Sequence, residues 1–135
     1  MISFNIETNF SLDNQKELSN WISNVISNEG FSEGDIIYIF CDDHYLLELN
    51  KEFLGHDTLT DIISFDYVVG KQINGEIYIS VDRIVENAKE LGVDFFEELL
   101  RVMIHGILHY CGFNDKSKEE VGLMRAKEDY YISKF

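Results

Sequence analysis

The chain has 135 residues, and its 25 Asp and Glu residues outnumber its 11 Lys and Arg residues, which gives a formal net charge of −14 at pH 7. This acidity excludes the general basic surface that follows nucleic-acid phosphates, so contact with nucleic acid would require a local cation, a metal ion or a protein partner. A hydrophobic fraction of 45% excludes an intrinsically disordered chain, and no apolar run reaches the ~20 residues of a membrane span.

The length predicts one domain over residues 1–135. The N-terminal segment, MISFNIETNF, lacks the basic region and apolar core of a secretory signal. Cys41 and Cys111 lack the close spacing of a metal site and are typical of reduced core residues. Together these features predict a cytoplasmic protein that does not bind a membrane.

Strand and helix patterns alternate in the first half of the chain. Alternating apolar and polar residues predict a strand over 2–7, and apolar residues at helical spacing predict a helix over 11–30. A second strand is predicted over 35–40 and a second helix over 42–55, with Gly55 at its end.

The second half begins with two strands, 61–69 and 75–81, joined by a loop that indicates a hairpin. Three helices follow, over 82–92, 94–111 and 118–132, and the middle one is apolar nearly all round. Helical connections in the first half favour parallel strands, and the hairpin adds an antiparallel one. The order therefore predicts an α+β fold with a single mixed four-stranded sheet, about five helices, and the apolar helix central and buried.

Two histidines lie four residues apart in this apolar helix. His105 and His109 share one helical face, so their ring nitrogens can bind one metal ion. Gly112 permits a chain reversal that would bring Asp115 back over the helix end as a third ligand. Three protein ligands leave a position open for water, as in catalytic sites, and the ligand types favour Zn²⁺, with Ni²⁺, Mn²⁺ or Fe²⁺ as alternatives.

The spacing of the two histidines alone also allows a simpler interpretation, in which both are core residues with satisfied hydrogen bonds. In the common zinc-peptidase motif a Glu directly follows the first His as general base, but here that position is Gly106. This difference argues against an ordinary metallopeptidase. The glycine leaves room beside the metal for a bulky substrate or for another segment of the chain.

Three longer segments carry further motifs: HGILHYCGFND (105–115), LNKEFLGHDTLTDIISF (49–65) and GEIYISVDRIVENA (75–88). In order and spacing they resemble the YbeY family, rRNA maturation factors described as metal-dependent endoribonucleases. The resemblance implies a zinc-dependent hydrolase of RNA phosphodiester bonds that acts in small-subunit 3′-end processing and ribosome quality control. It implies RNA, rather than DNA, and the small ribosomal subunit or its proteins as partners.

The chain departs from this family at two functional positions. The family's usual third ligand is His, whereas this chain has Asp115, a competent zinc ligand whose charge makes the metal a weaker Lewis acid. The family's usual arginine falls at Leu54, which cannot bind phosphate. His56, two residues on, is a candidate substitute because histidine can carry charge near neutral pH.

Two further residues are candidates for supporting the catalytic site. Asp61 could accept a hydrogen bond from a ligand histidine and fix its tautomer, or could only form a turn before the third strand. Arg101 lies one helical turn before the first histidine and could be a fixed cation, although an ion pair with Glu97 or Glu98 is the favoured expectation.

Two other functions stay open from the sequence. One is a metallohydrolase of another substrate class, such as peptides. The other is a non-catalytic ribosome-assembly factor in which a structural metal only fixes the turn after the helix, an alternative that Leu54 favours because it removes the expected cation.

Overall fold

A single mixed sheet forms the base of the molecule, and the computed structural model describes all 135 residues. The sheet has four strands in the order β1-β2-β4-β3, which are β1 (Ile2–Ile6), β2 (Ser32–Cys41), β3 (Ile62–Asp66) and β4 (Gln72–Ser80). Strand β2 is parallel to both β1 and β4, and β3 is antiparallel to β4. The predicted mixed four-stranded sheet is confirmed, because strands joined through helices run parallel and the hairpin strands run antiparallel.

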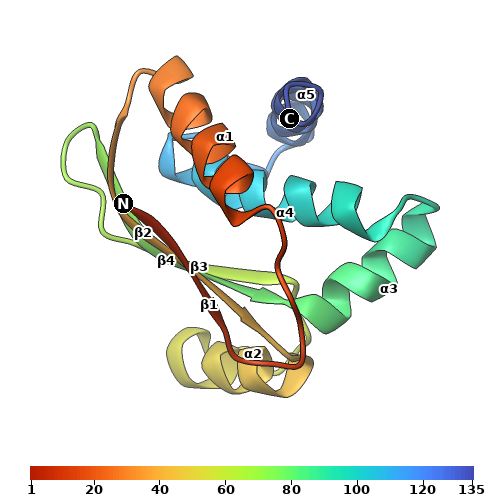
Figure 1. The fold of residues 1–135 in the computed structure, drawn as a ribbon. Coiled ribbons are helices and arrows are strands. Elements are labelled where there is room, and N and C mark those ends of the chain that lie inside the picture. The colour runs from red at the N-terminus through yellow and green to blue at the C-terminus, as the bar shows by residue number, and fades with distance from the viewer.

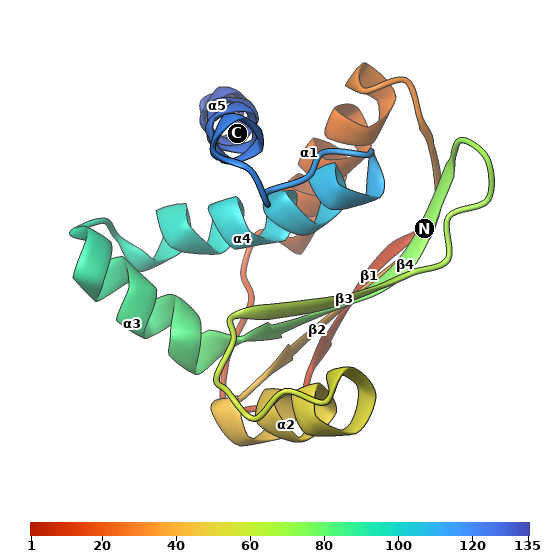
Figure 2. The ribbon, with the colours of Figure 1, turned by 180° about the vertical axis from the view of Figure 1, so that it is seen from behind.

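Helices cover both faces of this sheet. They are α1 (Gln15–Asn28), α2 (Asp43–Leu49), α3 (Val81–Leu91), α4 (Phe95–Tyr110) and α5 (Lys118–Ile132). Helices α1 and α4 lie over one face, α5 packs on the outer side of α4, and α2 lies on the opposite face (Figures 1 and 2). None of these helices combines the length and the apolar character needed to cross a membrane.

The helix predicted over 42–55 changes its winding part-way. Helix α2 passes at Asn50 into a π-helical turn, η1 (Asn50–Leu54), which ends at Gly55 in a left-handed conformation. The buried Asn50 side chain donates to the backbone carbonyl oxygen of Thr58 at 2.8 Å, and the backbone carbonyl oxygen of Asn50 accepts the N–H of His56 at 3.2 Å. The wide turn therefore depends on contacts with the loop that follows, which helical periodicity does not encode.

Helix α4 lies at the centre of the hydrophobic core, as the sequence predicts. Its buried apolar side chains are Leu99, Leu100, Val102, Met103, Ile104, Ile107 and Leu108. At Gly106 the helix comes so close to the sheet that a Cβ atom would lie 3.1 Å from Cδ1 of Ile77 and 3.2 Å from Cδ1 of Ile62. The room that this glycine leaves is filled by strands β3 and β4, so another chain segment occupies it and not a substrate.

A second close approach joins the end of α4 to the hairpin. A Cβ atom on Gly75, in β4, would overlap the ring of Tyr110. The Tyr110 hydroxyl lies 2.8 Å from the carbonyl oxygen of Phe65 and 3.1 Å from that of Glu76, so the ring is anchored to both strands of the hairpin. The ring cannot yield to a larger side chain without losing these hydrogen bonds.

We therefore expect Gly75→Ala to lower the free energy of unfolding by about 1–3 kcal/mol, the usual cost of overpacking. The matched control is Gly122→Ala on the exposed surface of α5, where an added Cβ meets no atom within 4 Å. That substitution should raise the free energy of unfolding by about 1 kcal/mol, because alanine is the better helix former. Urea denaturation measures both effects, and wild-type stability of Gly75→Ala would contradict the tight contact.

Candidate metal centre

The end of α4 and the turn after it bring the three predicted ligands together. Nε2 of His105 lies 2.9 Å from Nε2 of His109, and Oδ2 of Asp115 lies 3.2 Å and 3.4 Å from these two nitrogens. A tetrahedral ion with bonds of ~2.0–2.1 Å separates its ligand atoms by ~3.3 Å. The triangle of donor atoms therefore has the size that one Zn²⁺ ion requires.

The backbone of the turn sets the position of Asp115. The N–H of Gly112 donates to the carbonyl oxygen of His109, and the N–H of Phe113 donates to that of Leu108, both at 3.0 Å. These two bonds form the Schellman pattern at a helix C-terminus. Gly112 has a φ of 97°, which strongly favours glycine, so it reverses the chain as the sequence predicts.

A carboxylate from α5 holds the first histidine in place. Nδ1 of His105 lies 2.7 Å from Oε2 of Glu128, so the ring donates from Nδ1 when its Nε2 faces a metal ion. Burial alone lowers the pKa of His105, but the hydrogen bond and charge of Glu128, with the charge of Asp115, raise it overall. Glu128 is only 5% exposed, so its contact with the histidine is protected from water.

The same carboxylate binds Arg101. Nη1 of Arg101 lies 3.0 Å from Oε1 of Glu128, and its Nη2 lies 2.7 Å from Oδ1 of Asp129. This corrects the expected ion pair with Glu97 or Glu98. Because α5 packs along α4, it offers the guanidinium two carboxylates at once, which the arginine's own helix does not.

Two other candidate residues take positions that the sequence does not predict. Asp61 is near the triad, but its Oδ2 accepts a hydrogen bond from Nδ2 of Asn87 at 3.1 Å, and Glu128 makes the predicted bond to a histidine instead. Asp61 lies beside α3, where it accepts the hydrogen bond from Asn87. Helix α5 packs over His105 and therefore brings Glu128 to its ring. His56 is exposed in the loop after η1, and neither it nor Leu54 lines the pocket beside the triad, so the expected substitution of His56 for the arginine lacks structural support.

Glu128 is the residue that sequence reasoning missed, although the sequence carries a signal for it. The buried residues of α5 are Met124, Glu128 and Tyr131, spaced by four and three positions. A glutamate in the apolar stripe of an amphipathic helix needs a buried partner. Its partners proved to be a metal-ligand candidate and an arginine.

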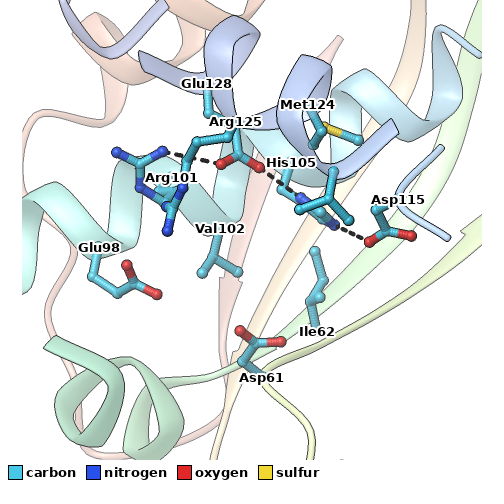
Figure 3. Close-up of a pocket in the computed structure, with 11 residues that line it drawn as sticks. Asp61, Ile62, Glu98, Arg101, Val102, His105, Asp115, Met124, Arg125 and Glu128 are labelled. Atoms are coloured by element: carbon cyan, nitrogen blue, oxygen red, sulfur yellow. Dashed lines mark hydrogen bonds and ion pairs between the residues drawn. The ribbon is translucent and has the colours of Figure 1, made fainter. Parts of the chain in front are cut away.

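A cavity of about 280 Å³ opens beside the triad (Figure 3). Its ionisable lining consists of His105, four carboxyl groups and two arginines, namely Asp61, Glu98, Asp115, Glu128, Arg101 and Arg125. Figure 3 shows Glu98 and Asp61 facing the cavity from the side opposite α5. Glu98 is 5% exposed, and burial and the charge of Asp61 raise its pKa.

The chain is similar in sequence to one protein family and in fold to a solved structure. The family described as Endoribonuclease YbeY matches residues 2–135. Endoribonuclease YbeY of Flavobacterium johnsoniae is 58% identical over 135 residues, which cover 100% of this chain and 97% of the relative. Endoribonuclease YbeY of Bacteroides thetaiotaomicron is 46% identical over 115 residues, covering 85% of this chain and 84% of the relative. The solution structure of TM1509 from Thermotoga maritima has a TM-score of 0.70 and 29% identity, and the match covers 98% of this chain and 87% of that one.

The raised pKa of Glu98 predicts how the stability of the protein depends on pH. The native state keeps the Glu98 proton to a higher pH than the unfolded chain does, so this residue makes stability fall as pH rises above about 4.5, its ordinary value, through the native pKa. Glu98→Gln should therefore gain stability relative to wild type over that range. Chemical denaturation at a series of pH values measures the difference, with Glu90→Gln on α3 as a control for net charge, and a constant difference for Glu98→Gln would contradict the prediction.

Proposed function

The chain belongs to the YbeY family of endoribonucleases, and we propose that it cleaves ribosomal RNA at a metal ion held by His105, His109 and Asp115. The observation that carries the metal site is the convergence of three donor atoms within 3.4 Å of one another. When bound, a divalent ion supplies Lewis acidity toward a phosphoryl oxygen and makes water a stronger nucleophile. Imidazole and carboxylate ligands favour Zn²⁺, with Ni²⁺, Mn²⁺ or Fe²⁺ as other candidates.

The protein's own groups prepare this site for a substrate. Glu128 accepts the Nδ1–H of His105 and thereby keeps the Nε2 lone pair available, and Arg101 in turn holds Glu128. The side chains of His105, His109 and Asp115 are 23%, 31% and 42% exposed. A phosphodiester can therefore approach the ligands from solvent while the helix that carries them stays buried.

The family and the net charge of the chain support a proposal for the substrate and for the cellular setting. We propose that the substrate is rRNA, and that the protein acts in 3′-end processing of the small subunit and in ribosome quality control. We further propose that it works in the cytoplasm and that its 135 residues form one domain. The net charge of −14 favours docking on basic ribosomal proteins over a general grip on bare RNA. The family supports an endoribonuclease over a peptidase, as does Gly106, which offers no general base beside the first ligand.

The protein loaded with Zn²⁺ should cleave a structured rRNA fragment, and a chelator should stop the reaction. His109→Ala should lose both the bound ion and the cleavage, because two ligands remain. His44→Ala, on the exposed face of α2, is the matched control and should keep both. Elemental analysis and denaturing gels give the two readouts. Cleavage by His109→Ala at the wild-type rate would rule out the metal-dependent mechanism. A wild-type protein that binds the ion but does not cleave RNA would favour a structural metal.

Glu128→Gln should weaken metal binding by about 10- to 100-fold, because the glutamine lacks the charge that orients and polarises the His105 ring. Asp129→Asn is the control, since Asp129 binds Arg101 but does not contact the histidine. Competition with a chromophoric chelator yields the Zn²⁺ dissociation constants. Equal constants for Glu128→Gln and wild type would show that the hydrogen bond does not support the site.

A further inference from the structure

The cavity beside the triad contains two cations, Arg101 and Arg125, and no lysine. This matters because Leu54 occupies the position where the family resemblance leads one to expect an arginine, and its side chain lies outside the cavity. A phosphodiester that enters the cavity brings negative charge to a lining that already has four carboxyl groups. A guanidinium able to bind that phosphate has to come from one of the two arginines.

Arg101 is already committed to other groups. Its two terminal nitrogens bind Glu128 and Asp129 at 3.0 Å and 2.7 Å, and its side chain is only 16% exposed. A phosphate bound across these two nitrogens would compete with the carboxylate that orients His105. Arg101 is therefore a residue that positions the metal-ligand candidates and is poorly suited to contact RNA.

Arg125 has the opposite character. Of the chain's three arginines, Arg83 pairs with Asp43 and Arg101 pairs with the α5 carboxylates, but Arg125 makes no ion pair and no side-chain hydrogen bond. Helix α5 presents it from the exposed position next to the buried Met124. Figure 3 shows Arg125 with Arg101 at the end of the cavity away from Asp115, on the same side of the cavity as α5.

We propose that Arg125 binds a phosphate group of the RNA beside the metal site and supplies the cation that is missing at position 54. Its planar fork of N–H groups matches two phosphate oxygens, and exposure leaves these groups free to do so. The volume of about 280 Å³ is near the lower limit of small-ligand pockets, so it suits a single nucleotide unit of the strand. This inference rests on the proposed ribonuclease function and names the residue that recognises the substrate backbone.

The test compares metal-loaded wild type, Arg125→Gln, Arg125→Lys and the control Lys16→Gln, which removes an exposed charge on α1. Arg125→Gln should lower kcat/KM for an rRNA fragment by about 10- to 100-fold, as expected for one charged hydrogen-bonding contact. The same substitution should weaken the salt dependence of RNA binding. For a fluorescent 2′-O-methyl RNA strand, the slope of the logarithm of the binding constant against the logarithm of salt concentration should become smaller by about 0.7. Arg125→Lys should keep the salt slope but lose part of the rate, and Lys16→Gln should match wild type.

Unchanged metal content together with a lower rate and a smaller salt slope in Arg125→Gln supports the proposal. Wild-type rate and slope in Arg125→Gln overturn the role of Arg125 and leave the nuclease proposal intact. An equal loss in Lys16→Gln, or loss of the metal from Arg125→Gln, also overturns it, because the effect is then one of net charge or of site integrity. Wild-type protein that neither binds nor cleaves RNA would reject the proposed function itself.

Discussion

Helix α4 has to be buried in the core and also has to present two histidines at an accessible site, and the packing of the sheet and of α5 meets both requirements. Gly106 permits the close approach to Ile62 and Ile77 that buries the sheet side of the helix. On the other side α5 covers Arg101 and the Nδ1 edge of His105 but leaves the side chain of His109, in the last turn of α4, 31% exposed. The histidines lie at the boundary between these covered and open parts.

One buried carboxylate links the fold to the site. Glu128 receives hydrogen bonds from both Arg101 and His105, so a charge that would otherwise be costly to bury is paired on two sides. The packing of α5 on α4 is thus partly electrostatic, and the orientation of a metal-ligand candidate depends on it. The packing of α5 and the orientation of the His105 ring therefore depend on the same side chain.

Capping residues, glycines and hydrophobic periodicity predicted most of the helices and strands. The features that these local patterns did not predict depend on backbone conformation or on contacts between distant elements. The helix from Lys118 to Ile132 matches its predicted bounds because Ser117 and Glu120 form a capping box within the sequence. The first helix begins at Gln15 and not at residue 11, since Asn14 adopts a left-handed conformation that periodicity does not reveal.

In the candidate site, too, local sequence patterns predicted some residues, whereas others depend on packing between distant elements. His105, His109 and Asp115 could be grouped from the sequence because the helical spacing and one glycine determine their arrangement. Glu128 could not be paired with a histidine, because that contact depends on how two helices pack side by side. The same is true of Arg125, whose access to the cavity is visible only once α5 is in place.

The turn at Gly112 separates the location of the third ligand from its chemical identity. Its hydrogen bonds are all between backbone atoms, so the side chain at position 115 takes no part in forming it. The codons for histidine and aspartate differ by a single nucleotide. One point mutation can therefore exchange a neutral ligand for an anionic one and alter the net charge around the ion, while the chain keeps its path.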